Sequence, residues 1–177
     1  MRILGISGSL RAISSNTSAL QAAALLAPPE SVIVLYKDLQ NLPHFNPDWD
    51  GDDPPDIVKA LRREVALADA MIICSPEYAH GVAGSMKNAL DWLVGSCEFP
   101  GKPVALINTS DRAVHSPAHL RETLITMSAC FVDEASITLP LLGRRLDAAG
   151  IANDAALSRE IRAAIDALIG AVNRKDV

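Results

Sequence analysis

The sequence predicts a three-layer doubly wound α/β fold, in which helices cover both faces of a parallel sheet. Short apolar segments alternate with longer helix-forming segments along the chain, so that a strand–helix unit occurs five times. The helical segments are long enough to return the chain to the same edge of the sheet, as parallel pairing requires. With 177 residues the chain has the length of one domain, so residues 1–177 are treated as a single domain.

The first elements follow from local composition and helix-stop signals. A short apolar run predicts a strand at Ile3–Ser7. The helix-forming residues 16–27 end at Pro28-Pro29, because proline cannot continue a helix. β-Branched residues then predict a second strand at Val32–Tyr36. A second helix is predicted at 56–68, where apolar residues recur at helical spacing.

The middle of the chain continues the alternation. The uninterrupted apolar run Ala70–Cys74 is typical of a strand that is covered on both faces. A helix is expected at 85–94, followed by a strand at Pro103–Asn108. Ser116-Pro117 has the pattern of an N-cap followed by a proline at the first helical position, which predicts a helix over 116–128.

The last strand is expected at Phe131–Leu139, and Asp154 is expected to cap a final helix that ends near residue 173. One segment fits this scheme poorly. Lys37–Pro55 is long for a loop inside a compact domain, and such loops are either functional or contain secondary structure of their own. Both interpretations stay open at this point.

Composition excludes several classes of function. A net charge of −5 argues against a general nucleic-acid binder, and 4% aromatic residues leave few rings for stacking on bases. The three cysteines are widely spaced, so neither a disulfide framework nor a cysteine-based zinc site is expected. No signal-peptide pattern follows Met1 and no apolar run approaches the roughly 18 residues of a membrane span, so we expect a cytoplasmic protein.

Ligands of open parallel sheets bind beyond the carboxyl ends of the strands, so the loops after strands one, three and four are the candidates. The first loop, residues 7–16, combines several hydroxyls with Arg11 at the start of a helix and contains no carboxylate. Helix amides, hydroxyls and a guanidinium together suit a phosphate dianion. The alternative is that Ser14 or Asn16 only caps the helix. The glycine spacing and the absence of lysine exclude a dinucleotide fingerprint and a Walker A loop.

The loop after the third strand carries Glu77, Tyr78 and His80 at the mouth of the sheet, and its glycines allow close approach of a ligand to the backbone. The alternatives are a half-buried packing role for Tyr78 and a simple surface position for His80. The loop after the fourth strand, residues 109–112, is polar and lies at the same edge, which favours a third wall of one cleft.

A metal site is not expected from the sequence. His115 and His119 are four residues apart, which can place two imidazoles on one helical face. However, Pro117 lies between them, and no neighbouring carboxylate in the sequence completes a ligand set.

At these loops the sequence resembles the NADPH-dependent FMN reductase family, flavodoxin-like flavoproteins that include quinone, azo-dye and chromate reductases. GSLRAISSN at 8–16 is similar to the family's GSLRxxSxN phosphate loop, and SPEYAHGVAGSMKNALDWL at 75–93 is close to its PEYxxxxxGxxKNAxDW signature. Residues 38–48 and 101–110 look like the segment after the family's second strand and like its fourth strand. The resemblance covers most of the chain and implies a flavodoxin-like sheet of five parallel strands in the order 2-1-3-4-5.

The resemblance also implies non-covalent binding of FMN. The residues implied to hold its phosphate are Ser9, Arg11, Ser14 and Asn16. Those implied to line the isoalloxazine, largely through backbone groups, are Pro76, Glu77, Tyr78, Ala79, His80 and Gly81, with Ser110 contributing from the third wall. Two departures stand out: Ala83 occupies a position where many members have proline, and residues 111–118 (DRAVHSPA) replace a stretch where many members have glycines.

The resemblance further implies the activity of an NAD(P)H-dependent oxidoreductase, with NADPH favoured as the donor. Electrons would pass through bound FMN to a small acceptor (a quinone, free flavin, azo compound or metal oxyanion) by a ping-pong mechanism, with no side chain acting as acid or base. The family is commonly dimeric or tetrameric, so a homodimer or homotetramer is expected, without nucleic-acid or membrane partners. The alternatives are a flavodoxin-like electron carrier and a phosphate-ligand binding module without flavin chemistry.

Overall fold

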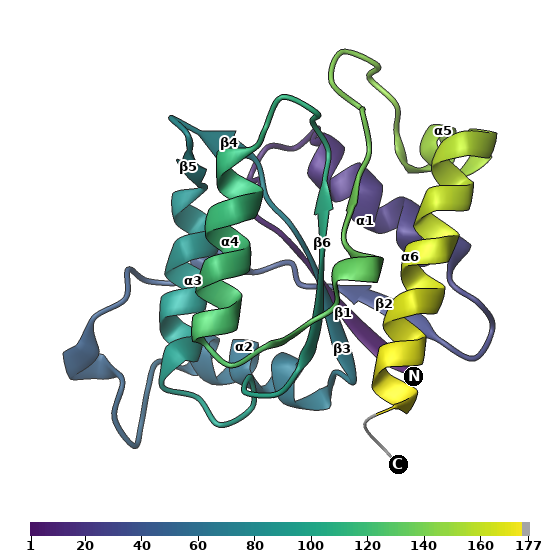
Figure 1. Cartoon of the computed structure of the whole chain (residues 1–177). Coiled ribbons are helices and arrows are strands. Elements are labelled where there is room, and N and C mark those ends of the chain that lie inside the picture. The colour runs from purple at the N-terminus through teal and green to yellow at the C-terminus, as the bar shows by residue number, and fades with distance from the viewer. Residues whose placement is uncertain (175–177) are drawn as a thin grey trace.

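The computed structural model describes residues 1–174 and has a parallel β-sheet at its centre (Figure 1). The sheet contains β1 (Arg2–Ser7), β2 (Val32–Leu35), β3 (Ala70–Cys74) and β6 (Pro103–Asn108) in the order β2-β1-β3-β6. Two short strands, β7 (Cys130–Phe131) and β8 (Ile137–Thr138), both pair with β6. The doubly wound fold and the strand order expected from the sequence are confirmed.

Helices cover both faces of the sheet (Figure 1). One layer contains α1 (Ser15–Leu26), α5 (Ala148–Asn153) and α6 (Ala155–Asn173), and the other contains α2 (Asp56–Leu67), α3 (Gly84–Val94) and α4 (His115–Thr126). Side chains alternate along β1, so that Ile3 packs toward the α1–α6 layer while Leu4 and Ile6 pack toward the α2–α4 layer. The sheet is therefore packed between two apolar cores, one on each face. The carboxyl ends of its strands lie at one edge.

The fifth strand differs from the expectation. The prediction of one continuous strand at 131–139 is wrong, because the 3-10 turn η3 (Asp133–Ala135) separates β7 from β8. The hydroxyl of Ser136 accepts a hydrogen bond from the Leu106 amide (3.1 Å) and donates one to the Val132 carbonyl (3.0 Å). A side chain therefore replaces a backbone partner where the strand is interrupted.

The starts of three helices can be compared with the sequence-based predictions. Asp154 caps α6 as expected, since its carboxylate accepts from the amides of Ala156 and Leu157 at 3.1 Å. The short helix α5 was not predicted; Asp147 caps it. Ser116 is not the N-cap of α4, because that helix begins at His115. None of the helices in the described part of the chain is long and apolar enough to cross a membrane.

The long segment at 37–55 contains two 3-10 turns, η1 (Leu39–Asn41) and η2 (Pro47–Trp49). Two side chains of α3 hold it: the Trp92 Nε1 and Asn88 Nδ2 groups donate to the Pro43 carbonyl at 2.8 and 2.9 Å. The Phe45 ring packs edge-on against Trp92, with centroids 5.0 Å apart. The segment therefore has secondary structure and packing of its own.

Further along the same segment, Asp50 forms a largely buried ion pair with Arg62 of α2. The Arg62 guanidinium also donates to the Trp92 carbonyl, at 2.7 Å from Nη2. One arginine therefore ties this segment to both α2 and α3.

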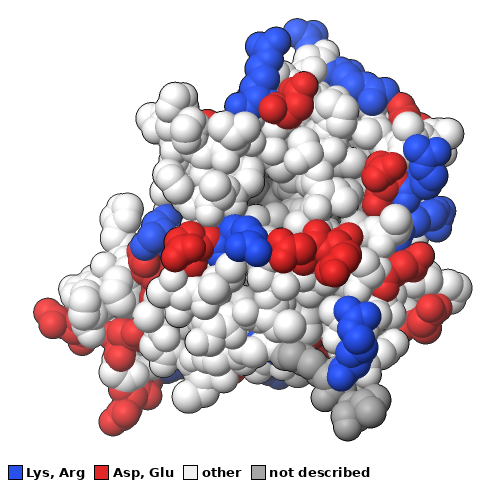
Figure 2. Space-filling view, viewed as in Figure 1, with Lys and Arg blue, Asp and Glu red and all other residues white. Residues whose placement is uncertain are grey.

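Charged side chains of both signs are interspersed on the face shown in Figure 2, without a broad patch of one sign. One ion pair joins Arg121 of α4 to Asp133 of η3. The same face is hollowed between α4 and β6, where a cavity of about 260 Å³ is lined mainly by uncharged residues, among them Leu106, Pro117 and Phe131.

Candidate functional site

A cleft opens at the carboxyl ends of β1, β3 and β6, where the polar loops were expected to meet. It has a volume of about 260 Å³. Eight of the predicted site residues line it: Ser9, Arg11, Ser14, Asn16, Pro76, Glu77, Tyr78 and Ser110. Segments that are more than 100 residues apart in the chain thus form one site, which is the arrangement that the strand order requires.

The loop between β1 and α1 is held closely against its neighbours. The Gly8 amide donates to the Cys74 carbonyl and the Ser85 hydroxyl donates to the Gly8 carbonyl, both at 2.8 Å. A Cβ atom at Gly8 would lie 2.6 Å from the Ser75 hydroxyl oxygen, so only glycine fits without displacement. These contacts therefore hold the loop in one conformation along the floor of the cleft.

The start of α1 presents donors to this cleft. Ser14 is the N-cap, and its hydroxyl accepts from the Thr17 amide at 3.4 Å. The amides of Ser15 and Asn16 have no acceptor among residues 1–174, and no acidic residue lies in the first turn. Ser14 therefore does cap the helix, as the simpler interpretation held, and unused amides remain beside it.

Arg11 lies on the exposed rim of the same loop and forms no ion pair with any described residue. A guanidinium without a carboxylate partner, next to free helix amides, is suited to an anion such as a phosphate monoester. The chemistry of these donors therefore fits a phosphate group.

Asn16 braces the floor of the cleft. Its side chain is buried, and its Oδ1 atom accepts from the Cys74 thiol at 3.1 Å and from the Thr109 hydroxyl at 3.2 Å. Burial raises the pKa of Cys74, so the thiol stays protonated and can donate. Asn16 thus joins α1 to the ends of β3 and β6, while its Nδ2 group has no partner in the described chain and is available to a ligand.

The segment after β3 forms a hairpin that was expected only as a loop. Its strands are β4 (Glu77–Tyr78) and β5 (Gly81–Val82), and the turn residues Ala79 and His80 have positive φ angles of 48° and 59°. Ala79, His80 and Gly81 do not line the 260 Å³ cavity, unlike the other predicted residues. A neighbouring cavity of about 390 Å³ extends the cleft on the other side of Arg11 and Tyr78.

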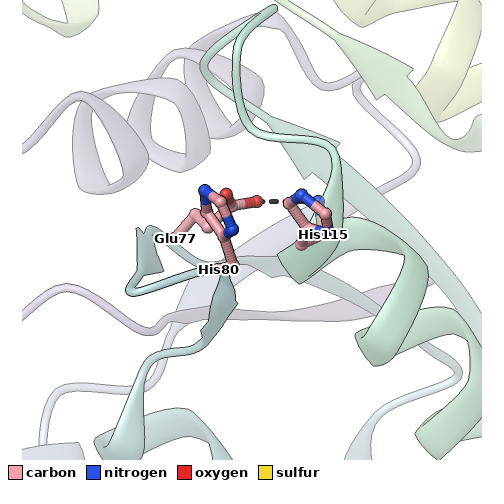
Figure 3. Close-up of side chains that lie close together, drawn as sticks. All are labelled: Glu77, His80 and His115. Atoms are coloured by element: carbon pink, nitrogen blue, oxygen red, sulfur yellow. Dashed lines mark hydrogen bonds between the residues drawn. The ribbon is translucent and has the colours of Figure 1, made fainter.

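Glu77 caps α4 through a long-range contact. Its Oε2 atom accepts hydrogen bonds from the amides of His115 and Ser116, both at 2.8 Å. These amides, that of Ser116 foremost, lower the pKa of Glu77. Figure 3 shows the Glu77 carboxylate directed at the start of α4, with the His80 and His115 rings beside it. The two rings stack with centroids 4.3 Å apart.

The third wall comes from the end of β6. The Asn108 side-chain amide donates to the carbonyls of Ser110 (2.7 Å) and Ala113 (2.9 Å), which fixes the loop that leads to α4. Sequence reasoning did not single out Asn108 or Leu142, which also line the cleft. Leu142 reaches it from the segment after β8, and no local signal marks that residue.

The chain is similar to known proteins of one family. Residues 1–141 match the family model described as NADPH-dependent FMN reductase. The chain is 35% identical over 155 residues to an NAD(P)H-dependent FMN reductase of Pseudomonas aeruginosa, covering 85% of this chain and 83% of the relative. It is 32% identical over 156 residues to a 2-hydroxy-1,4-benzoquinone reductase of a Burkholderia species, covering 85% and 84%.

The structure is similar to that of the flavoenzyme FerB, an NAD(P)H:(acceptor) oxidoreductase from Paracoccus denitrificans. The TM-score is 0.86 at 26% sequence identity, with 98% of this chain and 97% of the other covered. The likeness therefore extends over almost the whole fold and includes the segments that form the cleft.

Proposed function

Because the chain belongs to the NADPH-dependent FMN reductase family, we propose that it is an FMN-dependent NAD(P)H oxidoreductase that reduces a small acceptor such as a quinone. The observation that carries this proposal is the convergence of a carboxylate-free, Arg11-bearing loop with two further polar loops on one cleft. The enzymatic relatives favour this function over an electron carrier or a binding module without flavin chemistry.

In this proposal the phosphate of FMN lies on the β1–α1 loop. Ser9, Arg11 and Ser14 supply a hydroxyl, a guanidinium and the capped helix start, and Asn16 supplies its free Nδ2 group. These groups are hydrogen-bond donors or carry positive charge, so they match a dianion. The loop contains no carboxylate that would compete with the phosphate for them.

The isoalloxazine is assigned to the wall formed by residues 76–81, with Ser110 opposite. Support comes from Pro76, Glu77 and Tyr78, which border the cavity. Ala79, His80 and Gly81 lie beyond it on the hairpin, so their contact with the ring remains a prediction.

When bound, FMN supplies the redox chemistry, accepting a hydride from NAD(P)H and passing electrons on. The protein's own contribution is to bind the phosphate, to orient the ring against the backbone of residues 76–81 and to limit access through the cleft mouth. We propose that NAD(P)H and the acceptor occupy the mouth of the cleft in turn, which is a ping-pong mechanism.

The decisive experiment is the visible spectrum of the purified chain before and after incubation with FMN, followed by assays of NAD(P)H oxidation with a quinone. We expect a yellow protein, turnover that depends on the quinone, and parallel lines in double-reciprocal plots. A protein that takes up no FMN would refute the proposal, and FMN binding without turnover would support the electron-carrier alternative.

We also propose that the chain is a cytoplasmic homo-oligomer whose copies meet beside the cleft. Five large apolar side chains near the cleft are exposed: Leu10, Ile13, Tyr78, Val114 and Leu142. These five side chains belong to the segments that border the cleft, and contiguous exposed apolar surface marks a site of interaction. Light scattering after size-exclusion chromatography tests this proposal: Ile13→Arg should lower the mass to that of one chain, and a wild-type chain that is already monomeric would contradict it.

A further inference from the structure

We propose that Glu77, His80 and His115 form a binding site for a divalent transition-metal ion, with Zn²⁺ as the representative ion. The site would join the β4–β5 hairpin to the start of α4 at the mouth of the cleft (Figure 3). This inference does not depend on the proposed function, because none of its evidence involves flavin.

The three ligands come from separate segments that the fold brings together. One potential ligand atom from each residue lies within 4.8 Å of the others. Around zinc, bond lengths of about 2.0–2.2 Å place neighbouring ligand atoms roughly 3.3–3.6 Å apart, so the groups must approach by about 1 Å. Both histidines are exposed, so their rings can make this adjustment by side-chain rotation.

The ligand groups are free to bind. The imidazole nitrogens of His80 and His115 have no hydrogen-bond partner within residues 1–174, and the rings contact one another only by stacking. The Oε2 atom of Glu77 accepts the two helix amides, which leaves Oε1 without a partner. Groups that orient a ligand in this way raise metal affinity by fixing the geometry before the ion arrives.

The donor set selects the class of ion. Two neutral imidazoles and one carboxylate form the His₂Glu set that zinc accepts in open sites, with a fourth position left for water or another ligand. Nitrogen donors also disfavour Mg²⁺ and Ca²⁺, which prefer oxygen ligands. Zn²⁺ is the appropriate probe because it has no redox chemistry of its own and does not react with a flavin.

His119 offers a different pairing that the sequence spacing suggested. Its ring centroid lies 6.4 Å from that of His115, farther than His80, and it adds no carboxylate to the set. The structure therefore favours His80 as the second imidazole, and it supplies the carboxylate from Glu77, 38 residues before His115 in the chain.

The test is isothermal titration of ZnCl₂ into the full chain as purified, after EDTA treatment and without a polyhistidine tag. A Cys97→Ser background removes an exposed thiol, since thiolates are zinc ligands in general. We expect one ion per chain and at least about tenfold weaker binding in His80→Ala and in His115→Ala. The matched controls His44→Ala and His119→Ala change exposed histidines outside the set and should leave the affinity unchanged.

Glu77→Gln also weakens the cap of α4 by removing its negative charge, so the histidine variants carry the conclusion and Glu77→Gln is compared only after its fold is checked by circular dichroism. As a second readout, long-range ¹H–¹⁵N spectra should show shifts of the His80 and His115 rings on zinc addition and none of His44. Absence of zinc binding, or weakening by the control variants as great as by His80→Ala, would overturn the proposal. Because the titration does not need turnover, a chain without oxidoreductase activity still gives a definite answer.

Discussion

Replacing Arg11 with alanine tests the assignment of the β1–α1 loop to the phosphate of FMN. Arg11 forms no ion pair with a described residue and lies on an exposed rim, so its removal should leave the folded state intact. The variant should therefore affect ligand binding alone.

The magnitude follows from the exposure of the side chain. A hydrogen bond to a charged group contributes about 1.5–3 kcal/mol, and the solvent-exposed position of Arg11 favours the lower part of that range. A loss of about 1.5–2 kcal/mol corresponds to FMN binding that is weaker by a factor of roughly 10–30. Arg11→Lys keeps the charge but loses the fork of donors, so we expect an intermediate affinity.

The assay is quenching of FMN fluorescence on titration with apoprotein at low and high salt. Arg63→Ala is the matched control, because it removes the same charge from an exposed site on α2, away from the cleft. If Arg11→Ala binds FMN as tightly as the wild type, the assigned phosphate site is wrong. If Arg63→Ala weakens binding to the same extent, only net charge is being measured.

Three further predictions concern the fold around the site. Gly8→Ala should cost about 1–3 kcal/mol in urea unfolding, because the added methyl group would lie 2.6 Å from a neighbouring hydroxyl oxygen, whereas Gly84→Ala meets nothing within 4 Å; equal effects would contradict this. Burial, with the nearby carboxylates, raises the pKa of Tyr36 to about 12, and its buried hydroxyl has no partner among residues 1–174. The folded chain favours the protonated phenol, so this group leaves the free energy of unfolding unchanged below about pH 10 and lowers it as the pH rises towards 12. Tyr36→Phe removes this fall and should flatten that part of a stability–pH profile, without destabilising the chain at neutral pH, because the lost hydroxyl has no partner among the described residues; an unchanged alkaline profile would refute it. Asp50→Asn weakens a largely buried ion pair that holds the segment at 43–55, so chymotrypsin should cleave this segment faster. Cleavage at the wild-type rate would show that the apolar contacts alone hold the segment in place.

Local patterns predicted the elements that have local causes. The apolar run of β3 and the proline stop after α1 lie in the sequence itself, and Asp154 caps the helix that directly follows it. The cleft also followed from topology, because the carboxyl ends of parallel strands share one edge of the sheet and a crevice opens there at the point where the strand order reverses.

The contacts that could not be predicted join distant parts of the chain. Ser116 looked like a cap in its own sequence context, but Glu77 takes that role from 38 residues away. Asn88 and Trp92 belong to the motif that was assigned to the cleft, yet their side chains hold the segment at residue 43. Residue type and spacing do not specify which side chain accepts such a bond, since that depends on how the elements pack.

The interruption between β7 and β8 also determines how this protein can associate with other chains. A long, flat edge strand would expose a row of amides and carbonyls that could recruit a strand of another molecule. Here the β6 side of the sheet ends in two strands of two residues each, separated by η3, so no extended template for strand addition exists along this part of the chain. Copies that meet along this edge must therefore do so through side-chain surfaces, and this edge of the sheet is protected against growth into an intermolecular β-structure.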